Sequence, residues 1–201
     1  MPSQERMTTE LEAVNEMLAC VGEAPINTLT GDFPAAIQIA IDKLRSTSRA
    51  FQMMGWNFNT EEDWELSRAL DGTVELPGNT MDVDLTLEEW RVEVVQRGLR
   101  LYDKKNHTYI FDFNPKVTLK LFLPWDDLNE PARNYIKIMA ARIYQDQTVG
   151  SQEHHGFTEK DEAKAWVAFN ASDTENEDAT IFDSWDVGSI VHRKRPRISQ
   201  F

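Results

Sequence analysis

The sequence has few of the residues that enzyme sites and membrane anchors require. Cys20 is the one cysteine among 201 residues, so an internal disulfide cannot form, in agreement with a reducing compartment. No apolar run approaches the roughly 18 residues of a membrane span, and residues 1–6 lack the apolar core of a signal peptide. These absences predict a soluble protein that is made in a cytoplasm and does not contact a membrane.

Basic residues are also scarce. The chain has 21 Lys and Arg against 34 Asp and Glu, which gives a net charge of −13 and a pI near 4.7. Nucleic-acid binding requires a surplus of positive charge on the contact face, so this balance argues against it. The charge is unevenly spread: residues 151–188 hold ten acidic residues and two lysines, whereas residues 189–201 hold four basic residues and no acidic one.

Motifs for catalysis, metal binding or cofactor binding are missing. The nine glycines are scattered, and neither a phosphate-binding loop nor a Gly-x-Ser-x-Gly elbow occurs. Glu153, His154 and His155 have no His-Glu-x-x-His spacing, which favours a surface loop over a metal site. Cys20 lies beside an apolar stripe without a neighbouring histidine, so we interpret it as a buried hydrophobe. We expect no catalytic residue, metal or cofactor.

Apolar residues at helical spacing predict four helices, at about 9–21, 34–54 and 131–149 and from Thr158 onward. Thr9 and Glu12 fit a capping box at the start of the first helix. Between the second and third helices the sequence changes to short β-prone pieces separated by turn signals. We predict strands at 57–60, 73–76, 91–95, 99–102, 108–113 and 117–123, with the fourth and fifth paired as a hairpin.

The predicted fold is α+β: an antiparallel four-helix bundle with a small antiparallel β lobe inserted between helices 2 and 3, and an extended C-terminal tail. The bundle comprises residues 1–55 and 124–175, the lobe 56–123 and the tail 176–201. Because the helical pattern dissolves after about Thr174, we predict that a partner orders the tail.

The seam between the helices and the lobe carries a family resemblance. The order Gly55-Trp56-Asn57-Phe58-Asn59-Thr60-Glu61-Glu62, directly after a helix, resembles the tail tubular protein A family. These proteins are ring-forming adaptors between the portal and the tail nozzle of short-tailed phages, the podoviruses. The Ala-Val-Asn and Gly-Glu-x-Pro skeleton within residues 11–29, and residues 128–135 before an Ala-Ala-Arg helix, are similar to the family too.

The resemblance implies a structural protein of the virion tail, assembled in the host cytoplasm. It implies a ring, commonly of twelve copies, between the portal protein and the nozzle (tail tubular protein B), through which double-stranded DNA passes without specific binding. Ring closure requires a head-to-tail interface, and exposed helix faces offer candidates for it: Asp42, Arg45, Arg49 and Lys137. We expect acidic side chains to line the channel, because a basic wall would retain phosphate.

The basic run near the C-terminus suits docking to an acidic protein surface better than DNA binding, with a solvated tail as the other interpretation. Four positive charges can release only a few counterions from DNA, so they contribute little affinity for it. The rest of the chain is negatively charged and repels DNA. The predicted portal-docking residues combine these charges with apolar anchors: Trp185, Ile190, Val191, Arg193, Lys194, Arg195 and Arg197.

A second function class is open at this point: a carbohydrate-active or sugar-binding tail component. The stretch 56–65 combines several carboxylates with Trp56, Phe58 and Trp64, and sugars stack on such rings. A glycosidase needs two carboxyl groups about 5 to 10 Å apart across a cleft. A solvated turn beside a small sheet explains the same residues.

Overall fold

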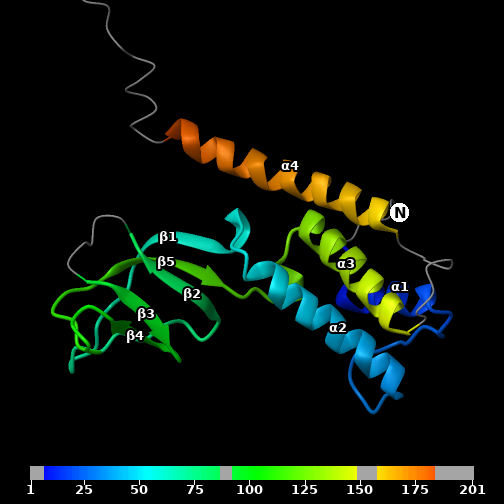
Figure 1. The fold of residues 1–201 in the computed structure, drawn as a ribbon, viewed down its shortest axis with the longest axis horizontal. Helices are drawn as coiled ribbons and strands as arrows, with labels where there is room; N and C mark the ends of the chain where they lie inside the picture. Colours follow the sequence, from blue (N-terminus) through cyan, green and yellow to red (C-terminus); the bar gives the residue numbers. More distant parts are fainter. Residues whose placement is uncertain (1–6, 87–91, 149–157, 184–201) are drawn as a thin grey trace, which may run out of the picture.

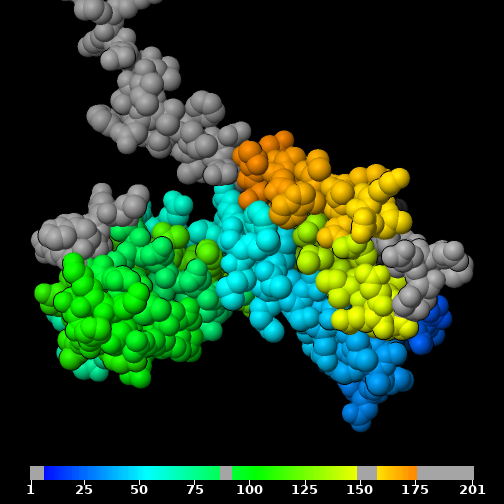
Figure 2. Space-filling view, viewed as in Figure 1, coloured from blue at the N-terminus to red at the C-terminus, as the bar shows by residue number. Residues whose placement is uncertain are grey.

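The computed structural model describes residues 7–86, 92–148 and 158–183, with side chains described as far as Glu175. These residues form a helical domain and a β lobe that lie end to end, joined where the second helix ends (Figures 1 and 2). The lobe is inserted between the second and third helices. The predicted α+β class, with four helices and small antiparallel sheets inserted between helices 2 and 3, is confirmed.

Three helices begin and end close to the predicted residues: α1 Glu10–Cys20, α2 Ala35–Gln52 and α3 Glu130–Thr148. The fourth, α4 Glu159–Asp183, begins where it is predicted. The predicted capping box is present, since Thr9 Oγ1 accepts from the Glu12 amide and the Glu12 carboxylate accepts from the Thr9 amide. α3 packs against α1, α2 and α4. α2, α3 and α4 run in alternating directions (Figure 1).

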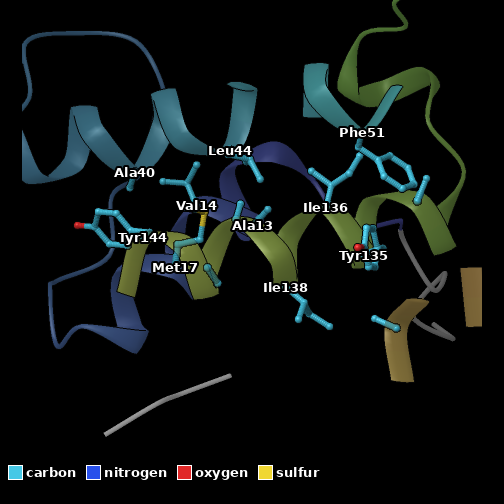
Figure 3. Close-up of a cluster of buried hydrophobic side chains, with 14 of the residues drawn as sticks. Ala13, Val14, Met17, Ala40, Leu44, Phe51, Tyr135, Ile136, Ile138 and Tyr144 are labelled. Carbon is cyan, nitrogen blue, oxygen red and sulfur yellow. The ribbon is translucent and has the colours of Figure 1, made fainter. Parts of the chain in front are cut away.

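Side chains of α1 and α2 on one side of α3, and of α4 on another, form the helical core with those of α3. Small residues such as Ala13, Ala40 and Ala140 let the helices approach closely, and Val14, Met17, Leu44, Ile136 and Tyr144 fill the layer between them (Figure 3). α4 is attached through Phe169, which is fully buried and contacts Phe51 and Trp56 with ring centroids 4.9 and 4.7 Å apart. Burial of a large side chain contributes about 2 kcal/mol, so the contacts of Phe169 help to hold α4 against the rest of the helical domain.

The lobe contains a three-stranded antiparallel sheet in the order β1-β5-β2 and a two-stranded sheet, β3-β4. The strands are β1 Thr60–Glu65, β2 Thr80–Leu85, β3 Val94–Arg97, β4 Arg100–Asp103 and β5 Lys116–Leu121. In β5, Val117, Leu119 and Leu121 are buried, as their alternation predicts. They form a second core with side chains that include Val74, Val83 and Leu101.

Several predicted strands are wrong. Residues 57–59 form a 3-10 turn rather than a strand, and residues 73–76 form isolated bridges to Arg68 and Arg100. β2 was not predicted, although Val83 faces the core while Asp82 and Asp84 face solvent. The acidic residues lower the β propensity of this stretch, and its alternation of apolar and acidic residues is the signal that identifies the strand.

The predicted hairpin of 99–102 with 108–111 is also wrong, because residues 100–103 pair with 94–97 instead. Gly98 has a φ of 65° and starts a two-residue loop of the kind that suits hairpins. Between β4 and β5, the isolated bridge from Asp103 to Thr108 takes the place of the predicted strand pairing. The carboxylate of Asp103 accepts from the amides of Lys105 and Asn106 and from the Asn106 side chain, which turns the chain away.

Asp103 gives a pH-dependent prediction. Burial raises its pKa, but the hydrogen bonds from Asn106, Glu93 and Lys105 outweigh burial and lower the pKa below its usual value. The ionised Asp103 carboxylate therefore stabilises the folded protein at pH values above its unfolded pKa, which is near 3.9. This contribution to the free energy of unfolding is lost as the pH falls through the pKa of Asp103 in the folded protein, which is lower. We expect Asp103→Asn to cost about 2 kcal/mol at pH 7, and this difference from wild type to shrink below about pH 4. Urea unfolding at a series of pH values measures both; a difference that is independent of pH would contradict the assignment.

The C-terminal region differs from its prediction as well. The predicted extended tail began at residue 176, whereas α4 continues to Asp183. Thr158 caps this helix as predicted, donating to the Asp161 carboxylate and accepting from the Asp161 amide. The sequence after Thr174 has weak apolar periodicity, so it contains no stripe from which the continuation of the helix could be predicted.

Two buried amides fix the lobe to the helices. The Gln52 side chain forms two hydrogen bonds with the backbone of Leu123, as a neighbouring strand would. Its Oε1 accepts from the Leu123 amide at 2.8 Å, and its Nε2 donates to the Leu123 carbonyl at 3.1 Å. Asn59 Nδ2 donates to the carbonyls of Gln52 and Leu121, and Asn59 Oδ1 accepts from the Trp56 amide. Gln52 is fully buried and Asn59 nearly so. This joint holds the end of α2 against the end of β5.

Candidate docking surfaces

The predicted ring-interface residues fall into two groups. Asp42, Arg45 and Arg49 lie on one exposed side of α2. Arg45 already contacts α1, since its Nε lies 2.8 Å from Glu10 Oε1. Lys137 lies on α3, where its ammonium group pairs with Glu16 at 2.8 Å and its side chain is 11% exposed. The structure therefore separates Lys137 from the α2 group.

Arg45 and Arg49 line a groove of about 250 Å³ beside the joint between the helices and the lobe. Its apolar lining comes from two parts of the chain. Leu44 lies on α2, and Phe122 and Trp125 lie on the connection between β5 and α3. The Arg49 guanidinium lies 6.0 Å from the centre of the Phe122 ring. Among the residues that the structure describes, no carboxylate pairs with Arg49, so the groove presents an uncompensated positive charge beside apolar side chains.

The Trp125 side of the groove is held by buried polar contacts. The Trp125 indole donates to the Thr8 carbonyl at 2.9 Å. Arg133, which is 4% exposed, donates to the same carbonyl and to the carbonyls of Leu128 and Asp126. The Glu130 carboxylate accepts from the amide and the hydroxyl of Thr8. The N-terminal segment, the short helix at Trp125–Asp127 and α3 are thereby tied together.

The acidic aromatic stretch is divided between the edge of the sheet and the surface of the helical core. Its four carboxylates, on Glu61, Glu62, Asp63 and Glu65, lie on the exposed strand β1 at an edge of the sheet. A bulge at Glu62 and Asp63 interrupts the pairing with β5, and Asp63 has a φ of 54°. Charges and bulges at an edge prevent pairing with another chain. Trp56 and Phe58 are half-buried and pack against the helical core, while Trp64 is 40% exposed.

The remaining candidates are structural or lie outside the described residues. A cleft of about 380 Å³ between α3 and α4 is bridged by Arg142, which pairs with Glu162 and Glu159. Cys20 is half-buried; burial, and then the charge of Glu16, raise the pKa of its thiol, which opposes thiolate chemistry. No group of potential metal ligands occurs within the ranges described above. Glu153, His154 and His155 lie outside those ranges, as do all seven predicted portal-docking residues.

No sequence pattern predicts the structural roles of Gln52, Asn59 and Arg133. Their roles depend on partners 71, 62 and 125 residues away along the chain, which no local pattern reveals. The available signal was indirect: a Gln on the apolar side of α2 near Phe51, and an Arg among the apolar positions of α3. A polar side chain at such a position is either buried with partners or functional.

Comparison with known proteins identifies the family. None of the described helices is long and apolar enough to cross a membrane. Curated proteins gave no match. The family of tail tubular proteins, by contrast, matches residues 11–179, which include all four helices almost entirely and the whole lobe. The chain therefore belongs to the tail tubular protein family and is a structural component of the phage virion tail.

Proposed function

We propose that this chain is the adaptor ring that joins the portal to the tail nozzle and surrounds the path of the ejected genome. One observation carries the proposal: a subunit of the tail tubular protein family has a helical domain at one end and a β lobe at the other. The buried side chains of Gln52 and Asn59 fix these two parts to each other. In this proposal one end of the subunit contacts the portal and the other end contacts the nozzle. A closed ring requires a fixed rotation between successive copies, and a fixed joint favours one rotation.

Assembly tests the proposal directly. Mass photometry of the purified protein, alone and mixed with the portal and nozzle proteins of the same phage, should give closed rings, commonly of twelve copies, and a complex with both partners. Incubation with a panel of polysaccharides serves as the test of the carbohydrate-active alternative, for which we expect no turnover. A protein that stays monomeric with both partners while hydrolysing a polysaccharide would overturn the proposal.

The charge of the channel is a separate part of the proposal. The net charge of −13 supports a lumen lined with Asp and Glu, which repels phosphate and lets the duplex slide. We expect an assembled ring to bind duplex DNA weakly at 150 mM salt. A lumen dominated by Lys and Arg would contradict this part.

The basic C-terminal run is proposed to dock on the portal. Its four positive charges within residues 189–201 follow an acidic segment, and that separation supports a contact directed away from the acidic channel. Removing residues 189–201 should reduce co-assembly with the portal while the rings of this chain still form. Unchanged co-assembly would remove the role proposed for the run.

A further inference from the structure

The groove beside the joint has the chemistry of a peptide-docking site. Phe122, Leu44 and Trp125 supply apolar surface, and Arg49 supplies a guanidinium that no described carboxylate neutralises. A guanidinium beside an aromatic ring favours a carboxylate partner in a well-defined direction, because its planar donors are pre-organised. The matching ligand is a short segment that combines large apolar side chains with acidic ones.

Such a segment is present near the C-terminus of the same chain. Residues 181–186 read Ile-Phe-Asp-Ser-Trp-Asp, so the segment combines three large apolar side chains with two carboxylates and one hydroxyl. The helix that leads to this segment buries Phe169, and among its described side chains no later residue is buried. The segment is therefore a candidate to find its apolar contacts on another surface.

α4, whose last turn includes the first three residues of this segment, lies away from the groove of its own subunit. α4 lies on the side of α2 that carries Phe51, as the contact between Phe51 and Phe169 shows. Arg49 precedes Phe51 by two residues, which places it about 200° away around the helix, on the opposite side of α2. Because α4 remains helical to Asp183, Ile181 and Phe182 have no extended linker with which to pass around α2.

We infer that the groove lined by Arg49, Phe122 and Trp125 receives residues 181–186 of a neighbouring copy. The inference rests on the proposed ring and names its head-to-tail contact. The end of α4 on one subunit enters the groove of the next, Phe182 and Trp185 supply apolar contacts, and Asp183 or Asp186 pairs with Arg49. A contact between two different surfaces is the kind that closes a ring. This contact takes Trp185 from the set of predicted portal-docking residues, whereas Ile190, Val191 and the basic residues within 189–201 remain available for the portal.

Photo-crosslinking tests the contact in the full-length protein. Phe122 is replaced by p-benzoylphenylalanine, and this variant is mixed with 15N-labelled wild-type protein under conditions in which rings form. We expect crosslinked peptides that join position 122 of one copy to residues 181–186 of a 15N-labelled copy. Crosslinks confined to a single copy, or directed in trans to another segment, would overturn the inference.

A charge swap tests the same contact by energetics. Arg49→Glu should weaken ring assembly about tenfold, as should the double variant Asp183→Arg/Asp186→Arg, and combining all three should restore most of it. Arg68→Glu, the same change at an exposed position of the lobe, is the matched control and should have little effect. Normal rings from Arg49→Glu would overturn the inference while leaving the proposed function standing. Absence of rings from the wild-type protein with both partners would instead refute the proposed function.

Discussion

Replacing Arg133 with methionine is expected to lower the free energy of unfolding by about 4 kcal/mol. Methionine keeps most of the volume but removes the donors to three backbone carbonyls, those of Thr8, Asp126 and Leu128. Arg133 is 4% exposed and its hydrogen bond to the Leu128 carbonyl is buried, so water does not readily replace that bond. Leaving a buried polar group unpaired costs about 1 to 3 kcal/mol, and the Thr8 carbonyl retains only the Trp125 indole.

Urea unfolding followed by tryptophan fluorescence measures this loss. Arg133→Lys should recover little of it, because a single ammonium group does not have the forked geometry that reaches three carbonyls. Lys104→Met is a control for loss of a cation, since its ion pair with Glu93 is exposed and worth about 0.5 kcal/mol. A loss below about 1 kcal/mol for Arg133→Met would show that this network contributes little to stability.

Replacing Asn59 with leucine should lower the free energy of unfolding by about 3 kcal/mol and loosen the joint between the helices and the lobe. The leucine preserves the volume but leaves the Leu121 carbonyl and the Trp56 amide without the Asn59 side chain. Asn59 is 2% exposed. Because the subunit count of a ring depends on the angle between successive copies, the variant should also give a broader distribution of ring sizes.

Asn79→Ala is the matched control for the joint. The Asn79 amide also donates to a backbone carbonyl of the returning segment, that of Phe122, but it is exposed, so its loss should cost little. Urea unfolding gives the stability, and mass photometry gives the ring sizes. If Asn59→Leu unfolded like Asn79→Ala and formed a single ring size, the joint would not determine the geometry of the assembly.

The helices were predictable because each one buries a stripe. Ala13, Val14, Met17 and Leu18 repeat at helical spacing and are all buried in α1, and the capping box marks where the helix begins. For α4, the helical pattern predicts the helix to about Thr174, a few residues beyond Phe169, which fixes it to the core. Its continuation to Asp183 follows no apolar stripe, and its hydrophobic periodicity is correspondingly weak.

The lobe was less predictable because its strands are short and pair over long distances. The pairing of β1 with β5 joins Thr60 to Lys120, and no local pattern specifies that partner. The hairpin was misplaced because Asp103 to His107 looks like a turn between strands, whereas the glycine that allows the tighter reversal is Gly98. Both segments contain turn residues, and packing on Leu101 and Val74 determines which of them forms the hairpin.

The candidate site was predictable only in part. Arg45 and Arg49 were selected as exposed charges on α2, and both line the groove. The groove itself could not be foreseen, because Phe122 and Trp125 arrive there only after the chain has passed through the whole lobe. Lys137 was chosen by the same reasoning and lies elsewhere, in an ion pair with Glu16. A helical pattern identifies the face on which a residue lies but not what covers that face.

The central claim is that this chain acts through its surfaces, as one copy in a closed ring between the portal and the nozzle. Electron cryo-microscopy of the intact virion tail tests it most directly. We predict one closed ring of this chain between the two partners, with its acidic side chains facing the DNA path. Density for the chain at any other place in the tail, or as single copies outside a ring, would contradict the account.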